Sequence, residues 1–148
     1  MGINFQGANS ATRAAVKRNA EMRTVFQKFH HVLRDCLADA NFAALVTSIS
    51  EIDRRDSFDV ESSLGYMARF RYTPGTGEHA LRGKVLVVVW RLGDDDDNGG
   101  EPIRISDFTF DGGGVSDISA AEHGLADLGD GLSAMYIVQT TFLETLAT

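Results

Sequence analysis

The segment 94–99 reads Asp-Asp-Asp-Asp-Asn-Gly, which matches the opening of a calcium-binding loop. Such a loop needs a bidentate carboxylate at its twelfth position to complete the cage of oxygen ligands. Counted from Asp94, that position is Ile105, an apolar residue in a predicted strand. We therefore expect no metal site here. Asn98-Gly99 is a typical hairpin-turn pair, and the segment is interpreted as a solvated hairpin loop.

Other groups that could do chemistry lack the partners that their chemistry requires. The glycine-rich segment 111–114 has no Lys or Arg after it, whereas a phosphate-binding loop needs Gly-Lys-Ser/Thr. His31 and Asp35 have helical spacing, but two ligands do not close a metal site. Cys36 lies beside acidic residues, which raise the pKa of a thiol. No catalytic motif is found, so we expect a protein that is not an enzyme and has neither cofactor nor metal.

Basic residues and the single tryptophan share strand faces farther along the chain. Arg69 and Arg71 share one face of a predicted strand, and Lys84 has the phase of Trp90 on the next strand. If the register aligns these faces, cations and an indole stand together, and the surface would suit an anionic small ligand or nucleic acid. A slip of one residue would separate them. Alternatively, the acidic C-terminal part or a second subunit neutralises these positive faces.

Charge is distributed unevenly along the 148 residues, whose net charge is −7. Residues 1–91 carry 13 basic and 9 acidic side chains (+4), and residues 92–148 carry 1 basic and 12 acidic side chains (−11). A protein that depends on phosphate neutralisation usually has a basic balance. Nucleic acid is therefore the less favoured partner. The acidic part instead suits a protein partner with a basic surface, because opposite charges speed association.

These observations predict a small acidic protein-binding module of the inhibitor, immunity, adaptor or chaperone type. We expect it to engage its partner through the acidic C-terminal half. The residues expected to contact the partner are Asp94, Asp95, Asp96, Asp97, Glu101, Asp127 and Asp130.

The sequence also predicts a cytoplasmic location away from membranes. The longest apolar run has six residues, 85–90, whereas a membrane-spanning helix needs about 20. The chain has one cysteine and no secretory leader pattern, which is typical of a reducing compartment.

Hydrophobic periodicity predicts one α+β domain over residues 1–148, with a flexible arm at 1–9. Apolar residues at steps of three and four predict a long amphipathic helix over 11–40, with basic residues on its outer side. Alternation then predicts an antiparallel meander of three to four strands, followed by C-terminal helices packed on the sheet. The predicted strands are 66–72, 81–92 and 103–110, and the predicted C-terminal helices are 119–128 and 132–146. The middle strand is apolar on both faces, so a homodimer that covers the second face is a further expectation.

Overall fold

The computed structural model describes residues 5–148 and begins with a helix of 31 residues, α1 (Phe5–Asp35). Residues 1–4 of the predicted arm lie outside the described part. The helix starts within the segment predicted as an arm and ends before residue 40. A short 3₁₀ turn (Cys36–Ala38) follows, and then α2 (Ala40–Leu45), whose first turn is capped because the Asp39 carboxylate accepts hydrogen bonds from the Asn41 and Phe42 N–H groups.

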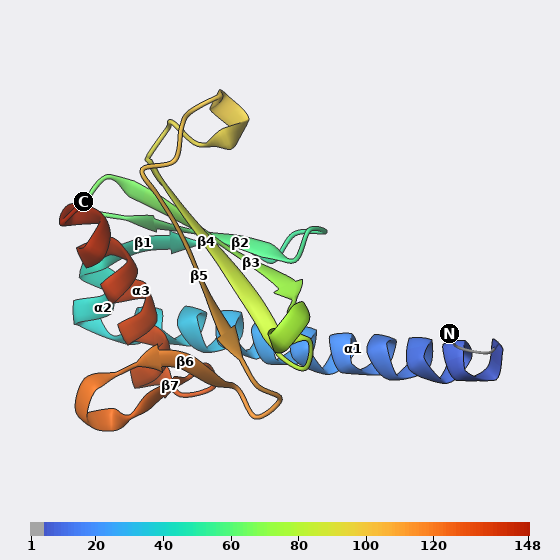
Figure 1. The fold of residues 1–148 in the computed structure, drawn as a ribbon. Coiled ribbons are helices and arrows are strands. Elements are labelled where there is room, and N and C mark those ends of the chain that lie inside the picture. Colours follow the sequence, from blue (N-terminus) through green and yellow to red (C-terminus); the bar gives the residue numbers. More distant parts are fainter. Residues whose placement is uncertain (1–4) are drawn as a thin grey trace.

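Residues 46–127 contain a seven-stranded antiparallel sheet in which every strand lies beside its neighbours in sequence (Figure 1). This corrects the prediction of three to four strands. One C-terminal helix, α3 (Gly131–Leu146), stands where several helices were expected. The strands are β1 (Val46–Ile49), β2 (Ser57–Ser62), β3 (Tyr66–Pro74), β4 (Gly83–Arg91), β5 (Arg104–Phe110), β6 (Val115–Ser119) and β7 (Leu125–Asp127).

Strand β7 and the last residue of β6 stand where a helix was predicted over 119–128. Ser119 to Glu122 matches a helix capping box, but the chain makes only a 3₁₀ turn there (Ala121–His123). Gly124 has φ +75°, outside the helical region, and its carbonyl accepts the Ala120 N–H to close the β6–β7 hairpin. Ala120, Ala126 and Leu128 are therefore buried in the core from a hairpin rather than from a helix.

Strand β2 went unpredicted because acidic residues interrupt it. Its pattern alternates correctly, with Phe58 and Val60 buried and Asp59 and Glu61 on the other face. Aspartate is unfavourable in strands unless a cross-strand neighbour compensates, and Asp59 lies directly opposite Arg69 on β3. Arg69 is seven residues beyond the end of β2, so the periodicity within β2 alone does not indicate this partner.

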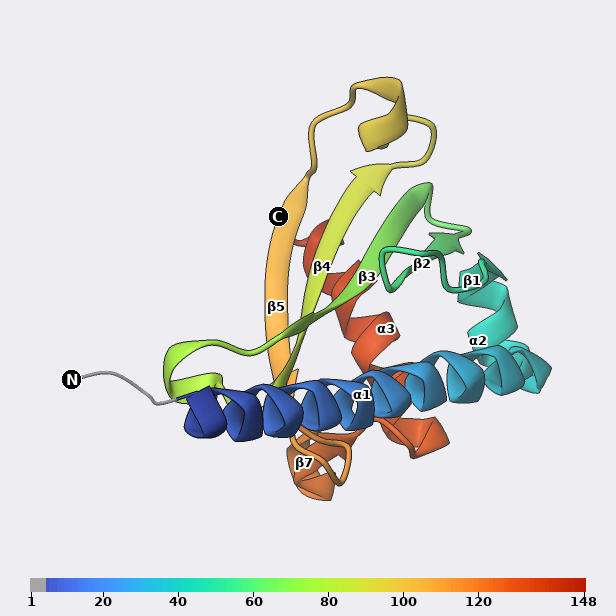
Figure 2. The same cartoon turned by 90° about the vertical axis from the view of Figure 1, so that its right-hand side faces the viewer.

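Helices α1 and α3 cover one face of the sheet (Figures 1 and 2). Between these helices and the sheet lies an aromatic core, in which ring centroids stand 5.4–6.4 Å apart around Phe26 and Phe29. The opposite face of β2 to β5 carries no helix, and we call it the open face. No helix of the described chain has both the length and the apolar character that a membrane span requires. The fully buried phenylalanines are Phe26, Phe29, Phe42, Phe58, Phe70, Phe110 and Phe142.

Candidate functional site

The strand register places the basic residues and the tryptophan of the sheet on the same face. On β3, Arg69 and Arg71 alternate with core residues, and on β4 Lys84 and Trp90 do the same. Arg69 lies directly opposite Val88 on β4, and side chains of directly paired residues share a face. Val88 is two residues from Trp90 and four from Lys84, so all four side chains belong to the open face.

A cavity of about 450 Å³ lies on this face. Its floor is apolar, and charged side chains of both signs surround that floor. The lining consists of three residues of β4 (Leu86, Val88, Trp90), three arginines (Arg55, Arg69, Arg71), three aspartates (Asp53, Asp96, Asp97), Ser57 and Pro102.

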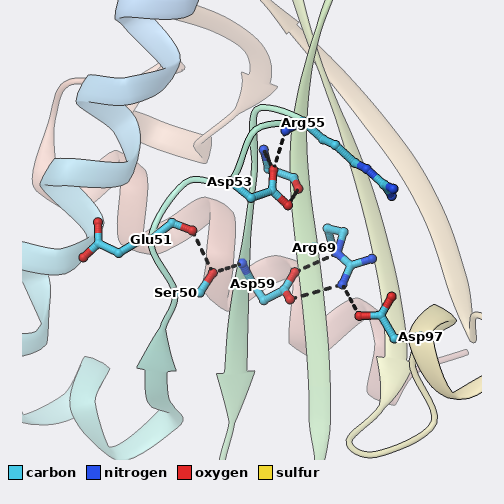
Figure 3. Close-up of polar contacts among 8 residues, drawn as sticks. Ser50, Glu51, Asp53, Arg55, Asp59, Arg69 and Asp97 are labelled. Carbon is cyan, nitrogen blue, oxygen red and sulfur yellow. Dashed lines mark hydrogen bonds and ion pairs between the residues drawn. The ribbon is translucent and has the colours of Figure 1, made fainter.

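Arg69 is the central cation of the cavity and is held from two sides. Its Nε and Nη2 donate to the two carboxylate oxygens of Asp59 at 2.8 and 3.2 Å (Figure 3). Its guanidinium carbon lies 5.2 Å from the centroid of the Trp90 ring, within the range of a cation–π contact. The hydrogen bonds to Asp59 raise the pKa of Arg69 above its ordinary value. The guanidinium is therefore a fixed positive charge against the indole.

Trp90 is 5% exposed although it stands on the open face. The β4–β5 loop, residues 92–103, contributes Asp96, Asp97 and Pro102 to the same cavity and closes that end of it. The Nε1–H of Trp90 is buried and has no hydrogen-bond partner within the described part of the chain. Such buried donors are rare in folded proteins because an unpaired N–H costs about 1–3 kcal/mol. A bound acceptor would remove that cost.

The β1–β2 turn supplies the other wall of the cavity. Asp53 accepts hydrogen bonds from the Arg55 N–H at 2.8 Å, from the Ser57 N–H at 3.1 Å and from the Ser57 hydroxyl at 2.9 Å. Desolvation raises the pKa of Asp53, but these hydrogen bonds outweigh it and hold the pKa below its ordinary value. Figure 3 shows the side chain of Arg55 extending away from this turn.

We expect Ser57→Ala to make stability depend less on pH. The low pKa of Asp53 contributes stability above the ordinary aspartate pKa, and this contribution is lost as the pH falls through the folded-state pKa. The variant should therefore lose about 1 kcal/mol of unfolding free energy at neutral pH, and the loss should shrink in acid. Urea titrations across this pH range measure both. Ser63→Ala is the control, because the Ser63 hydroxyl donates to the Ala44 carbonyl and its loss should cost the same at every pH. A loss of stability in Ser57→Ala that is also constant with pH would contradict the prediction.

The other two arginines of the cavity differ from Arg69. No ion pair to the guanidinium of Arg55 or Arg71 is found among residues 5–148, so both remain available to a bound group. Lys84 does not line the cavity. Its Nζ lies 3.3 Å from an Asp107 carboxylate oxygen, farther along the open face.

The seven acidic residues predicted to contact a partner do not form one surface. Asp94 to Asp97 and Glu101 lie in the β4–β5 loop, whereas β7 and the start of α3 lie at the other end of the fold (Figure 1). There, Asp127 accepts the Gly129 N–H at 2.8 Å, and Asp130 caps α3 by accepting the Ser133 N–H at 3.0 Å. Only Asp96 and Asp97 reach the cavity, where they stand with Arg69, Arg71 and Trp90.

Cys36 lies outside the cavity and is half-buried. Burial, with Asp35, Asp39 and Asp130, raises the pKa of the Cys36 thiol, which opposes a role as nucleophile. Within the described residues, no cluster of three His, Cys, Asp or Glu side chains is arranged to hold a metal ion.

Comparison with protein-family models, with curated proteins and with solved structures finds no match. The site therefore has to be interpreted from its own residues. Sequence analysis missed Arg55 and Asp53, and the only signal for them was the Asp-x-Arg-x-Ser spacing at 53–57, which suits a turn closed by the aspartate side chain.

Proposed function

We propose that this protein is a non-enzymatic binding module whose open face binds a segment of a partner protein. The observation that carries the proposal is the cavity that combines an apolar floor with the Arg69–Trp90 pair and charges of both signs. Protein interfaces have this anatomy, with an apolar centre and a polar rim. Tryptophan and arginine are also the residue types that most often dominate binding energy.

The apolar floor extends beyond the cavity onto the next strand. Ile105 on β5 lies directly opposite Val88 and is 64% exposed. Leu86 and Val88 are half-buried. A contiguous apolar strip across β4 and β5 is thus accessible, and exposed apolar patches with polar rims are typical of interaction sites.

The charges around the floor favour a partner segment that carries both an acidic and a basic group. A carboxylate of the partner would lie between Arg55 and Arg71, whose guanidinium groups have no acidic partner among the described residues. A lysine or arginine of the partner would lie at Asp96 and Asp97 at the other end of the cavity. The expected partner therefore carries basic groups, as the sequence predicts, and an acidic group beside them.

Photo-crosslinking in the cells that produce the protein tests this proposal. A photoreactive residue at Ile105 should yield a defined crosslinked partner, and the same residue at Leu81, which is exposed outside the cavity, should not. Arg71→Glu should reduce the Ile105 crosslink at least about tenfold, because it replaces attraction by repulsion. Arg91→Glu, the same change at an exposed site outside the cavity, is the matched control. An undiminished crosslink in Arg71→Glu would contradict the proposal.

A second candidate function is the binding of a small anionic ligand. The two guanidinium groups without ion pairs beside the buried Trp90 N–H favour it. Titration with inorganic phosphate and with nucleotides at low salt, read by Trp90 fluorescence, separates the two functions. Saturable quenching in the wild type that is lost in Arg71→Glu would favour the small ligand; unchanged fluorescence would favour the protein partner.

A further inference from the structure

The first part of α1 is a helix that lies largely in solvent. It extends past the sheet (Figures 1 and 2), and residues 8–17 are all exposed. Helices of about 12 residues are marginal in water unless an apolar face is packed. Phe5, Ala8, Thr12 and Val16 form such a face by their helical spacing, and Phe5 and Val16 are 81% and 64% exposed. Val16 borders a cavity that Pro74 and Ala80 also line, and Phe5 and Val16 stay exposed enough for a further contact.

A groove of about 650 Å³ between β7 and α3 has matching properties. Leu125 and Leu132 line it and are 55% and 72% exposed, and Tyr136, one turn farther along α3, lines it as well. Asp127 and Asp130 line the same groove and make it acidic. The groove thus offers exposed leucines beside two carboxylates.

We propose that residues 5–16 of one copy lie in the β7–α3 groove of a second copy. The segment is about 18 Å long at 1.5 Å per residue, and an amphipathic helix in an apolar groove is a common mode of recognition. Arg13 and Lys17 flank the apolar face of the helix, and up to residue 20 the chain has no acidic residue. These cations complement Asp127 and Asp130 of the groove.

Charge selects this arrangement over its alternatives. Pairing of two α1 segments with each other would bring together Arg13, Lys17 and Arg18 from both copies without any acid up to residue 20. Insertion into the acidic groove instead neutralises them. When each copy inserts its helix into the other, the dimer is symmetric and contains two identical junctions, which closes the assembly at two copies. The open face stays free, so this inference does not depend on the proposed function.

Size-exclusion chromatography with light scattering tests the dimer. The wild type should have the mass of two chains at micromolar concentration. Phe5→Asp and Leu132→Asp should each weaken dimerisation at least about tenfold, because each buries a carboxylate in an apolar contact. Leu81→Asp, a change at a leucine of similar exposure outside the groove, should remain a dimer. Circular dichroism confirms that each variant is folded.

Mixing the two variants tests which surfaces meet. A Phe5→Asp copy retains an intact groove and a Leu132→Asp copy retains an intact helix, so their mixture regains one of the two junctions. The mixture should therefore dimerise more tightly than either variant alone. A wild type that stays monomeric at about 100 µM, a dimer insensitive to both substitutions, or a mixture no better than the single variants would each overturn the inference.

Discussion

Gly100→Ala is expected to open the β4–β5 loop and to shift the fluorescence of Trp90 to longer wavelength. A Cβ at residue 100 would lie 1.6 Å from the carbonyl oxygen of Asp94, and backbone atoms cannot yield as a flexible side chain can. The Gly100 N–H also donates to the Asp95 carbonyl at 3.0 Å, which closes the loop. Because the loop covers one end of the cavity, its opening should expose the indole to water.

The measurement is direct because Trp90 is the only tryptophan. We also expect the Ile105 crosslink to fall, since Asp96 and Asp97 would leave the cavity. Gly112→Ala is the matched control: its Cβ would meet only the Met22 side chain at 3.7 Å, an ordinary van der Waals contact in another loop. A Gly100→Ala spectrum that coincides with that of the wild type would show that the loop does not shield Trp90.

Phe29→Ala is expected to cause the largest loss of stability, about 3–5 kcal/mol of unfolding free energy. The side chain is 0% exposed. Its ring lies within 6.4 Å, centroid to centroid, of four other phenylalanine rings: Phe26, Phe58, Phe70 and Phe108. Removing it leaves a cavity at the point where α1 meets the sheet, and the rigid rings around it cannot close that cavity.

Urea denaturation followed by circular dichroism measures this loss. Phe29→Leu should cost clearly less, since most of the buried volume is retained. Leu81→Ala should cost within about 0.5 kcal/mol, as expected for an exposed side chain. If Phe29→Ala were as stable as Leu81→Ala, the aromatic core would not be what holds α1 on the sheet.

The parts of the fold with a strong local period could be predicted from sequence. The apolar stripe of α1, strands β3 to β5 and helix α3 all repeat over seven residues or more. β2 and the β6–β7 hairpin could not, because their stability depends on partners elsewhere: Arg69 opposite Asp59 in the first, and core packing of Ala126 in the second. The three residues of β7 are too few to show a strand period, so the capping box at 119–122 predicted a helix instead.

Local periodicity also indicated only part of the candidate site. Arg69, Arg71 and Trp90 lie on two strands joined by a hairpin, so alternation indicated a shared face once the register was known. Arg55 comes from a turn before β2 and Asp97 from a loop after β4, and only the folded sheet brings them to one cavity. Ion pairs join the basic and the acidic part of the chain where Lys84 meets Asp107 and Arg69 meets Asp97, and others stay within one part. Arg23 pairs with Asp56 and Arg34 with Glu51, all within the basic part.

The two outermost strands of the sheet are its shortest, four residues in β1 and three in β7. An exposed strand edge is a template for the addition of another chain, and short edges are a common protection against edge-to-edge aggregation. This sheet therefore offers little backbone on which a foreign strand can pair. A partner has to be recognised by side chains rather than by extending the sheet, and the protein should resist fibril formation even at high concentration.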